Sequence, residues 1–133
     1  MKGADTMNAT DTQASAVMDP ARRTNARLDG WKTSVVEGRR LAKTMAKCLK
    51  PFDLTVDEWL IMDTIAGHGG ITMSGLAQDT VLPAATLSRL VDRLVDEALL
   101  YRKANPFDRR QIQVYVSQRG MRLMEKIAED LNE

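Results

Sequence analysis

Cysteine is almost absent from this sequence: Cys48 is the single one in 133 residues. One cysteine excludes an internal disulfide framework and is typical of a reducing compartment. Long apolar runs are also missing, since no window approaches the length of a membrane span and the N-terminal stretch lacks the apolar core of a secretory signal. We therefore expect a soluble, cytoplasmic protein that does not enter a membrane.

Histidine and catalytic groupings are equally scarce. His68 is the only histidine, and one histidine with one cysteine is too few for a zinc cluster. No nucleophile, base and orienting residue occur at a suggestive spacing, and no glycine-rich phosphate loop is present. The sequence thus predicts no enzyme, no metal site and no cofactor, and His68 is expected to interact with the dipole at a helix end.

A strong excess of one charge is missing too. Nineteen basic residues face eighteen acidic ones, for a net charge of +1, so attraction to a polyanion must come from where the charges lie. Between Pro83 and Arg119 the balance shifts to seven basic residues against four acidic ones. The basic residues there are Arg89, Arg93, Arg102, Lys103, Arg109, Arg110 and Arg119.

What the chain does have is amphipathic helices. Residues 1–18 lack periodicity and are expected to form a flexible tail, and residues 19–133 a single domain. Asp19-Pro20 indicates the start of a helix that pauses at Gly30 and ends at Pro51. Its apolar positions recur at helical spacing. They are Trp31, Val35, Ala42, Met45 and Leu49.

Three further helices begin at recognisable caps. Thr55 and Glu58 form a capping box for a helix that Gly67 to Gly70 end, and Thr72 caps a small helix over residues 73–79. Pro83 in a first-turn position opens the third, which runs to Glu97. Its predicted buried positions are Leu87, Leu90, Val91, Leu94 and Val95, and its predicted outer positions are Thr86, Ser88, Arg89 and Arg93.

Two strand-like runs follow, at residues 99–103 and 111–116, and predict a hairpin. The connection from Asn105 to Arg110 has turn chemistry and carries Arg109 and Arg110. We expect one of these arginines to contact a ligand and the other to pair with Asp108 and stiffen the hairpin. Ser117 then caps a final helix. Its apolar stripe is Leu123, Met124, Ile127, Ala128 and Leu131.

The predicted fold class is mainly α with a small β-hairpin: a winged helix-turn-helix flanked by dimerisation helices at about residues 20–50 and 118–133. In such folds the second helix fits the major groove of DNA and the wing reaches the minor groove. The sequence therefore predicts a protein that binds double-stranded DNA. Because some winged-helix domains bind proteins, a protein-interaction module stays open as an alternative.

The wing also carries a family resemblance. Asp108-Arg109-Arg110, five intervening residues and Val116-Ser117-Gln118-Arg119-Gly120 resemble the wing signature of MarR-type regulators. The segments Leu54–Trp59, Leu76-Ala77 and Thr86–Leu94 fall in the same family's order, so the likeness covers roughly residues 31–127. It implies a homodimeric transcriptional regulator, usually a repressor, on a pseudo-palindromic operator. In many relatives a small aromatic or amphipathic effector releases the DNA.

The resemblance assigns roles to individual residues. Thr86, Ser88 and Arg89 match groove-facing positions, and Arg93 matches a phosphate or structural contact. Arg110, supported by Asp108, matches the wing arginine that enters the minor groove. Pro83, Ala84 and Ala85 stand where many relatives have hydroxyl residues, which favours contacts with thymine methyl groups over hydrogen bonds.

Two regulatory sites and the dimer interface complete the expectations. By likeness, Met45, Phe52, Trp59 and Met62 line an effector cleft, although such a stripe is also typical of a core. Cys48 is a candidate redox switch because Lys47 and Lys50 favour a thiolate, and a small packed residue is its other interpretation. Relatives continue into another long helix where this chain ends at Glu133. We therefore expect the first helix and the final stripe to supply the dimer interface.

Overall fold

The computed structural model describes residues 25–132, which belong to two compact units, residues 1–41 and residues 42–133. The tail predicted for residues 1–18 and the helix start predicted at Asp19-Pro20 lie outside the described residues. The boundary between the units falls within helix α2 (Ala26–Leu49). No helix in residues 25–132 combines the length and the apolar character needed to cross a membrane.

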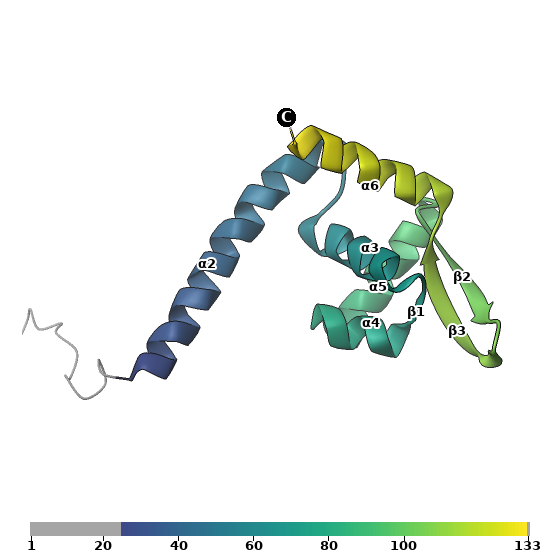
Figure 1. The fold of residues 1–133 in the computed structure, drawn as a ribbon, viewed down its shortest axis with the longest axis horizontal. Coiled ribbons are helices and arrows are strands. Elements are labelled where there is room, and N and C mark those ends of the chain that lie inside the picture. The colour runs from purple at the N-terminus through teal and green to yellow at the C-terminus, as the bar shows by residue number, and fades with distance from the viewer. Residues whose placement is uncertain (1–24, 133) are drawn as a thin grey trace, which may run out of the picture. The chain divides into compact units, whose positions relative to one another are not determined.

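The described part of the first unit is the beginning of α2 (Figure 1). The Asn25 side chain accepts a hydrogen bond from the Leu28 amide at 3.1 Å and so satisfies a free N–H group of the first turn. The helix runs without interruption through Gly30, so the predicted pause there is wrong. A single glycine costs a helix only about 1 kcal/mol relative to alanine, which the helix-forming residues on both sides offset.

The second unit contains the last turns of α2 and the winged helix that follows them. Its elements are the 3₁₀ turn η1 (Lys50–Phe52), α3 (Val56–His68), β1 (Ile71–Thr72), α4 (Met73–Thr80), α5 (Ala84–Asp96), β2 (Leu100–Asn105), β3 (Asp108–Val116) and α6 (Gln118–Leu131). The mainly α fold with a β-hairpin is therefore confirmed. In Figure 1 the hairpin of β2 and β3 extends beyond the helices of this unit.

The predicted caps are confirmed. The Thr55 hydroxyl accepts a hydrogen bond from the Glu58 amide, and the Glu58 carboxylate accepts one from the Thr55 amide, which completes the capping box of α3. Thr72 and Ser117 cap α4 and α6 through their hydroxyls alone, which accept hydrogen bonds from the Gly75 and Gly120 amides. Gly69, with a left-handed φ of 65°, ends α3.

The hairpin is part of a three-stranded antiparallel sheet of order β1-β3-β2. Ile71 pairs with Val114 and Thr72 with Gln113, so the extended piece at Ile71 is an edge strand of the wing sheet. Two residues are too few to show the alternation by which a strand is recognised in a sequence. The pairing ties the base of the wing to the start of α4.

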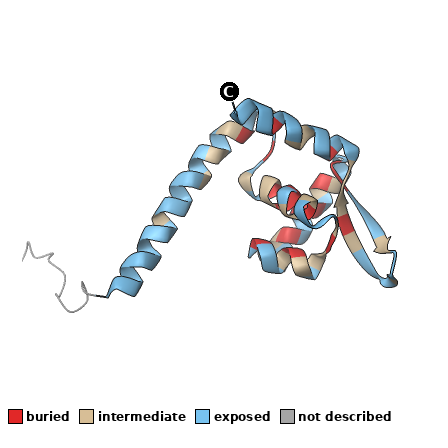
Figure 2. Cartoon of the chain, in the orientation of Figure 1, coloured by how far each residue is buried: buried red, intermediate tan, exposed pale blue. Residues whose placement is uncertain are grey.

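The core lies between α3, α4, α5 and the sheet, where Figure 2 shows the buried residues in red. Its fully buried hydrophobic side chains include Ile61, Met62, Ile65, Leu76, Leu87, Val91, Leu94, Leu100, Val114 and Ile127. Burying one such side chain is worth about 1.5–3 kcal/mol. Since α5 buries one face here, its opposite face is presented to solvent.

Candidate nucleic-acid interface

Helix α5 is held by its buried face. Its buried residues are Leu87, Leu90, Val91 and Leu94, and half-buried Val95 packs against them. Pro83 is the residue before the helix, one position earlier than its predicted place in the first turn. This difference is small because proline's fixed φ suits both positions. The connection to α4 contains Val81, whose left-handed φ of 57° lets α5 turn away from α4.

The first two turns of α5 expose few side chains that can form hydrogen bonds. Ala84, Ala85, Ser88 and Arg89 are exposed, and their spacing places them on one side of the helix. Thr86, expected on the outside, is only half-buried. The first two turns therefore expose two methyl groups, one hydroxyl and one guanidinium. Further along the same side, Asp92 and Asp96 are also exposed, and Asp92 pairs with Arg102.

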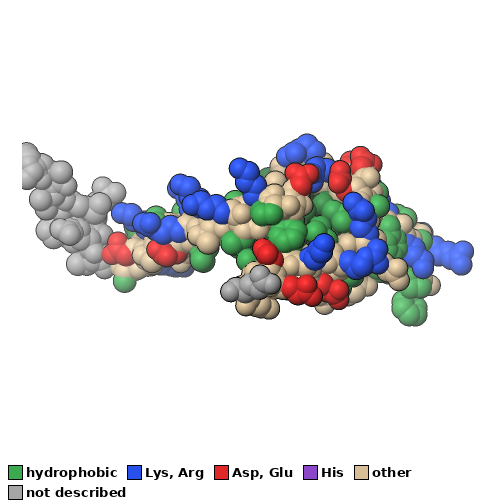
Figure 3. Space-filling view, turned by 90° about the horizontal axis from the view of Figure 1, so that it is seen from above, with side chains coloured by type: hydrophobic (Ala, Val, Ile, Leu, Met, Phe, Trp, Pro, Cys, Tyr) green, Lys and Arg blue, Asp and Glu red, His purple; other side chains and the backbone are tan. Residues whose placement is uncertain are grey.

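The wing tip carries exposed arginines on an ordered support. Arg109 and Arg110 lie at the start of β3, after a turn at Pro106-Phe107. Asp108 Oδ1 accepts hydrogen bonds from the Arg110 amide at 3.1 Å and from Arg110 Nε at 3.2 Å. The Arg110 side chain is 92% exposed. Figure 3 shows Lys and Arg side chains in blue at the end of the view where Figure 1 places the hairpin.

The seven basic residues of this region fall into two groups. Arg93, Arg102, Arg110 and Arg119 contact acceptors within the chain, as when Arg119 Nε donates to the Glu97 carbonyl at 3.1 Å. Arg89, Lys103 and Arg109 are exposed and form no ion pair with another described residue. The cations available to a ligand are therefore these three, with Arg110 beside its own aspartate.

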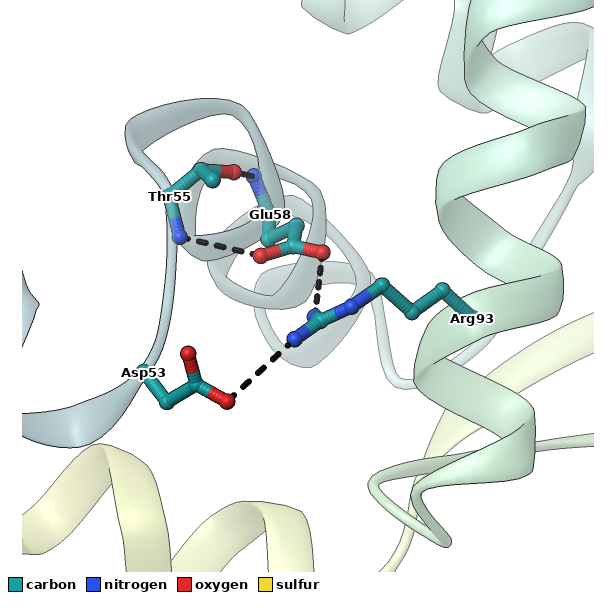
Figure 4. A network of polar contacts seen from close by, with 4 residues as sticks. All are labelled: Asp53, Thr55, Glu58 and Arg93. Carbon is teal, nitrogen blue, oxygen red and sulfur yellow. Dashed lines mark hydrogen bonds and ion pairs between the residues drawn. The ribbon is translucent and has the colours of Figure 1, made fainter.

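Arg93 anchors α5 to the start of α3. Figure 4 shows its guanidinium between two carboxylates, with NH1 2.5 Å from Glu58 Oε2 and NH2 3.5 Å from Asp53 Oδ2. Glu58 is only 2% exposed, and a buried carboxylate is stable only when it is paired and hydrogen-bonded. Of the two roles proposed for Arg93, the structure contains the structural contact. The capping box suggested Glu58 as a local cap and gave no signal for this long-range partner.

A pocket of about 470 Å³ adjoins this ion pair. Its lining includes Lys50, Thr55, Glu58, Arg89 and Leu90, so it joins η1, the cap of α3 and the exposed side of α5. Lys50 and Arg89 were not among the residues expected at a cleft, because residues distant in sequence meet here only through the fold.

The four residues expected at an effector cleft do not gather around this pocket. Met62 is fully buried in the core, Trp59 packs against the core, and Met45 is half-buried. Phe52 lines a smaller pocket of about 250 Å³ together with Arg119. Helical spacing groups apolar residues equally for a core and for a cleft, so it could not separate the two.

Cys48 and His68 have local environments that the sequence left open. Cys48 is a free thiol, half-buried in the last turn of α2. His68 Nε2 lies 2.8 Å from Asp79 Oδ2 and so links the end of α3 to α4. His68 therefore has a carboxylate partner in addition to its position at the helix C-terminus.

Residues 52–111, which run from the end of η1 through α3, α4, α5 and β2 into the first residues of β3, match the model of the MarR family. The chain is 33% identical over 98 residues to the HTH-type transcriptional regulator YhbI of Bacillus subtilis, a match that covers 74% of this chain and 64% of YhbI. It is 24% identical over 90 residues to the HTH-type transcriptional repressor IacR of Pseudomonas putida, covering 68% of this chain and 54% of IacR. The chain thus spans less than two thirds of these curated relatives.

Solved structures share the fold. A variant of MarR from E. coli, complexed with operator DNA, matches with a TM-score of 0.69 and 22% identity over 79% of this chain and 75% of that one. NadR in complex with 4-hydroxyphenylacetate matches with a TM-score of 0.67 and 22% identity over 75% of this chain and 72% of that one. With the wing sequence, the family model and these folds in agreement, the chain belongs to the MarR family of winged helix-turn-helix proteins.

Proposed function

We propose that this protein is a transcriptional regulator that binds double-stranded DNA in a sequence-specific manner. One observation carries the proposal. The same compact unit contains both an exposed face of α5 and a wing tip with exposed Arg109 and Arg110. A helix of this kind enters the major groove, while arginine suits both phosphates and the narrow minor groove. The name of IacR as a repressor and the operator complex of E. coli MarR support the same function.

In this proposal the helix and the wing read DNA differently. Ala84 and Ala85 contact thymine methyl groups, and Ser88 and Arg89 donate hydrogen bonds to base edges or phosphates. Thr86 and Pro83 shape the start of the helix beside them. Arg110, oriented by Asp108, enters the minor groove, and Arg109 contacts the flanking phosphates.

We also propose that the regulator acts as a homodimer on a pseudo-palindromic operator. Leu28, Trp31 and Val35 on α2 are 52%, 57% and 51% exposed, and with Ala42 they follow the seven-residue repeat of a helix that packs against another helix. On α6, Met121 and Leu131 are 43% and 53% exposed. Each apolar face lacks a cover within the described chain, and a second copy would bury it. Light scattering should give the mass of a dimer at micromolar concentration, and a monomer would contradict this part of the proposal.

Release by a small aromatic or amphipathic effector completes the proposal. The pocket of about 470 Å³ combines the cations of Lys50 and Arg89 with the apolar side chains of Leu54, Val56 and Leu90. The two carboxylates of its lining, Asp53 and Glu58, are paired with Arg93. A small aromatic acid matches that lining, and 4-hydroxyphenylacetate, the compound bound by NadR, belongs to this class. Since Arg89 belongs to both the pocket and the outer face of α5, an occupant that engages its guanidinium would compete with DNA.

The effector is tested with 4-hydroxyphenylacetate as the probe. We expect it to release bound duplex from the unmodified protein, and Lys50→Ala to need about tenfold more of it, the loss typical of one charge-assisted contact. Lys50 lies outside the proposed DNA contacts, so Lys50→Ala should bind duplex normally when no probe is present. Release at the same concentration from both proteins would exclude this pocket.

Salt dependence tests DNA binding against the alternative of a protein-interaction module. Affinity for duplex should fall steeply as salt rises, because each phosphate contact releases condensed counterions. A flat dependence, or no retained duplex, would support a protein partner. The measurement needs only titrations of a labelled random duplex at several salt concentrations.

A further inference from the structure

The wing tip presents an aromatic side chain that the fold does not use. Phe107, in the turn between β2 and β3, is 96% exposed, the highest value among the large exposed hydrophobic residues of the described chain. Burying a phenylalanine is worth about 1.5–3 kcal/mol, and here that energy is not gained. The turn chemistry of the segment from Asn105 to Arg110 gives no sign of this exposure.

The turn itself does not require the ring. Asn105 Oδ1 accepts a hydrogen bond from the Phe107 amide at 2.8 Å, and Asn105 Nδ2 donates to Gln111 Oε1 at 3.2 Å. Both contacts use the Asn105 side chain, and the first would form with any residue in place of phenylalanine. Pro106 adds a fixed φ to the same turn. The Phe107 side chain therefore needs an explanation outside the folding of the hairpin.

The surroundings of the ring favour one kind of partner. Asp108, the nearest acidic residue in sequence, is engaged by Arg110, while Lys103 and Arg109 are exposed without an ion pair among the described residues. The exposed Phe107 ring, with cations near it on the same hairpin, complements a polyanion that has an apolar interior. Double-stranded DNA has this composition, because its charged backbones enclose stacked bases.

We propose that Phe107 is an apolar wedge that the wing places in the minor groove, where its ring partly unstacks one base-pair step. This inference rests on the proposed function. Architectural proteins insert Phe, Leu or Pro between base steps in this manner, and the unstacking bends the duplex toward the major groove. On the same tip, Arg110 would enter the minor groove beside the wedge, and Arg109 would hold a flanking phosphate.

The wedge would add to the limited sequence preference that the outer face of α5 supplies. Ala84 and Ala85 form no hydrogen bonds to bases through their side chains, so direct readout by α5 is limited. Unstacking costs least at pyrimidine–purine steps such as TA and most in stiff A-tracts. The protein should therefore prefer a flexible step at the wing-facing position.

The test compares Phe107→Ser with Phe107→Leu, which keeps an apolar wedge. A series of duplexes is used, and each duplex carries either a TA or an AA step at one position flanking the half-site. The fluorescent base 2-aminopurine replaces the adenine of that step, and its fluorescence rises when the step is unstacked. We expect the unmodified protein and Phe107→Leu to prefer one TA duplex by about tenfold and to raise its fluorescence on binding. Phe107→Ser should still bind duplex but lose both the preference and the fluorescence change.

Three other results would overturn the inference. If Phe107→Ser keeps the TA preference and the fluorescence change, the ring is not the wedge. If the unmodified protein binds TA and AA duplexes equally at every position, no wedge exists, although DNA binding stands. If the unmodified protein binds no duplex, the proposed function fails as well. Equal thermal melting of all three proteins controls for folding, since the exposed ring contributes no core contact.

Discussion

The recognition helix α5 and the wing differ in how they are held and in what they expose. Helix α5 is fixed by a buried face and by the Arg93 to Glu58 ion pair, and the solvent side of its first two turns carries mostly small groups. The wing is held at its tip by local bonds from Asn105 and Asp108, and it exposes cations and an aromatic ring. In α5 the more C-terminal arginine stabilises the fold, so most of the charge available to a ligand comes from the wing.

The largest effect should follow from removing the anchor of α5. Arg93→Met leaves the buried Glu58 carboxylate without its charge partner. Breaking a fully buried pair costs about 3–5 kcal/mol, and because the Arg93 side chain is 40% exposed we expect the free energy of unfolding to fall by about 2 kcal/mol. Urea unfolding measures this change.

Arg89→Met is the matched control for that experiment. Arg89 lies on the same helix and forms no ion pair among the described residues, so its loss should change stability by less than about 0.5 kcal/mol. Equal losses of stability from the two substitutions would mean that the ion pair of Arg93 with Glu58 does not anchor α5.

The next effect concerns the wing arginine. Arg110→Ala should weaken operator binding by about 20-fold, because its guanidinium is the proposed minor-groove contact. Arg119→Ala should have little effect, since Arg119 donates to the Glu97 carbonyl at the base of the wing. Fluorescence anisotropy with labelled operator compares them, and equal weakening would remove the special role of the wing tip.

A smaller effect should follow at the neighbouring arginine. Arg109→Ala removes a proposed phosphate contact, so affinity should drop by about fivefold on all duplexes alike. The slope of log affinity against log salt should fall by about one. A change in base preference without a change in slope would instead assign Arg109 to the bases.

The smallest effect tests the exposed alanines of α5. Replacing thymines of the half-site with uracil removes the methyl groups that Ala84 and Ala85 are proposed to contact, and should weaken binding by about threefold. Ser88→Ala should cost a similar amount through one lost hydrogen bond. If uracil weakens binding more than Arg110→Ala does, the helix and not the wing dominates readout.

Local signals predicted much of this molecule. The Thr55 and Glu58 capping box, the glycine stop at Gly69 and the amphipathic stripe of α5 each depend on residues within a few positions, and all were found in the structure. The wing signature around Arg110 was also local. Such patterns place helix ends and a hairpin without any knowledge of tertiary contacts.

Contacts between residues far apart in the chain could not be predicted from the sequence. The pairing of Ile71 with Val114 and the ion pair of Glu58 with Arg93 join residues more than thirty positions apart. Met62, assigned to a cleft by family likeness, is buried in the core, which was its other interpretation. Periodicity identifies an apolar face without saying what covers it. The exposure of the Phe107 side chain could not be predicted either, because whether an aromatic residue in a turn packs against the fold depends on the three-dimensional structure.

The most direct test of the account is selection of bound sequences from random duplex DNA, performed in parallel with the unmodified protein and Arg110→Ala. The account predicts that the unmodified protein enriches an inverted repeat with preferred bases both in the half-sites and in the flanks that face the wings. Arg110→Ala should keep the half-site preference and weaken that in the flanks, where only the step preference proposed for Phe107 would remain. Failure of the unmodified protein to enrich any sequence would contradict the proposed function.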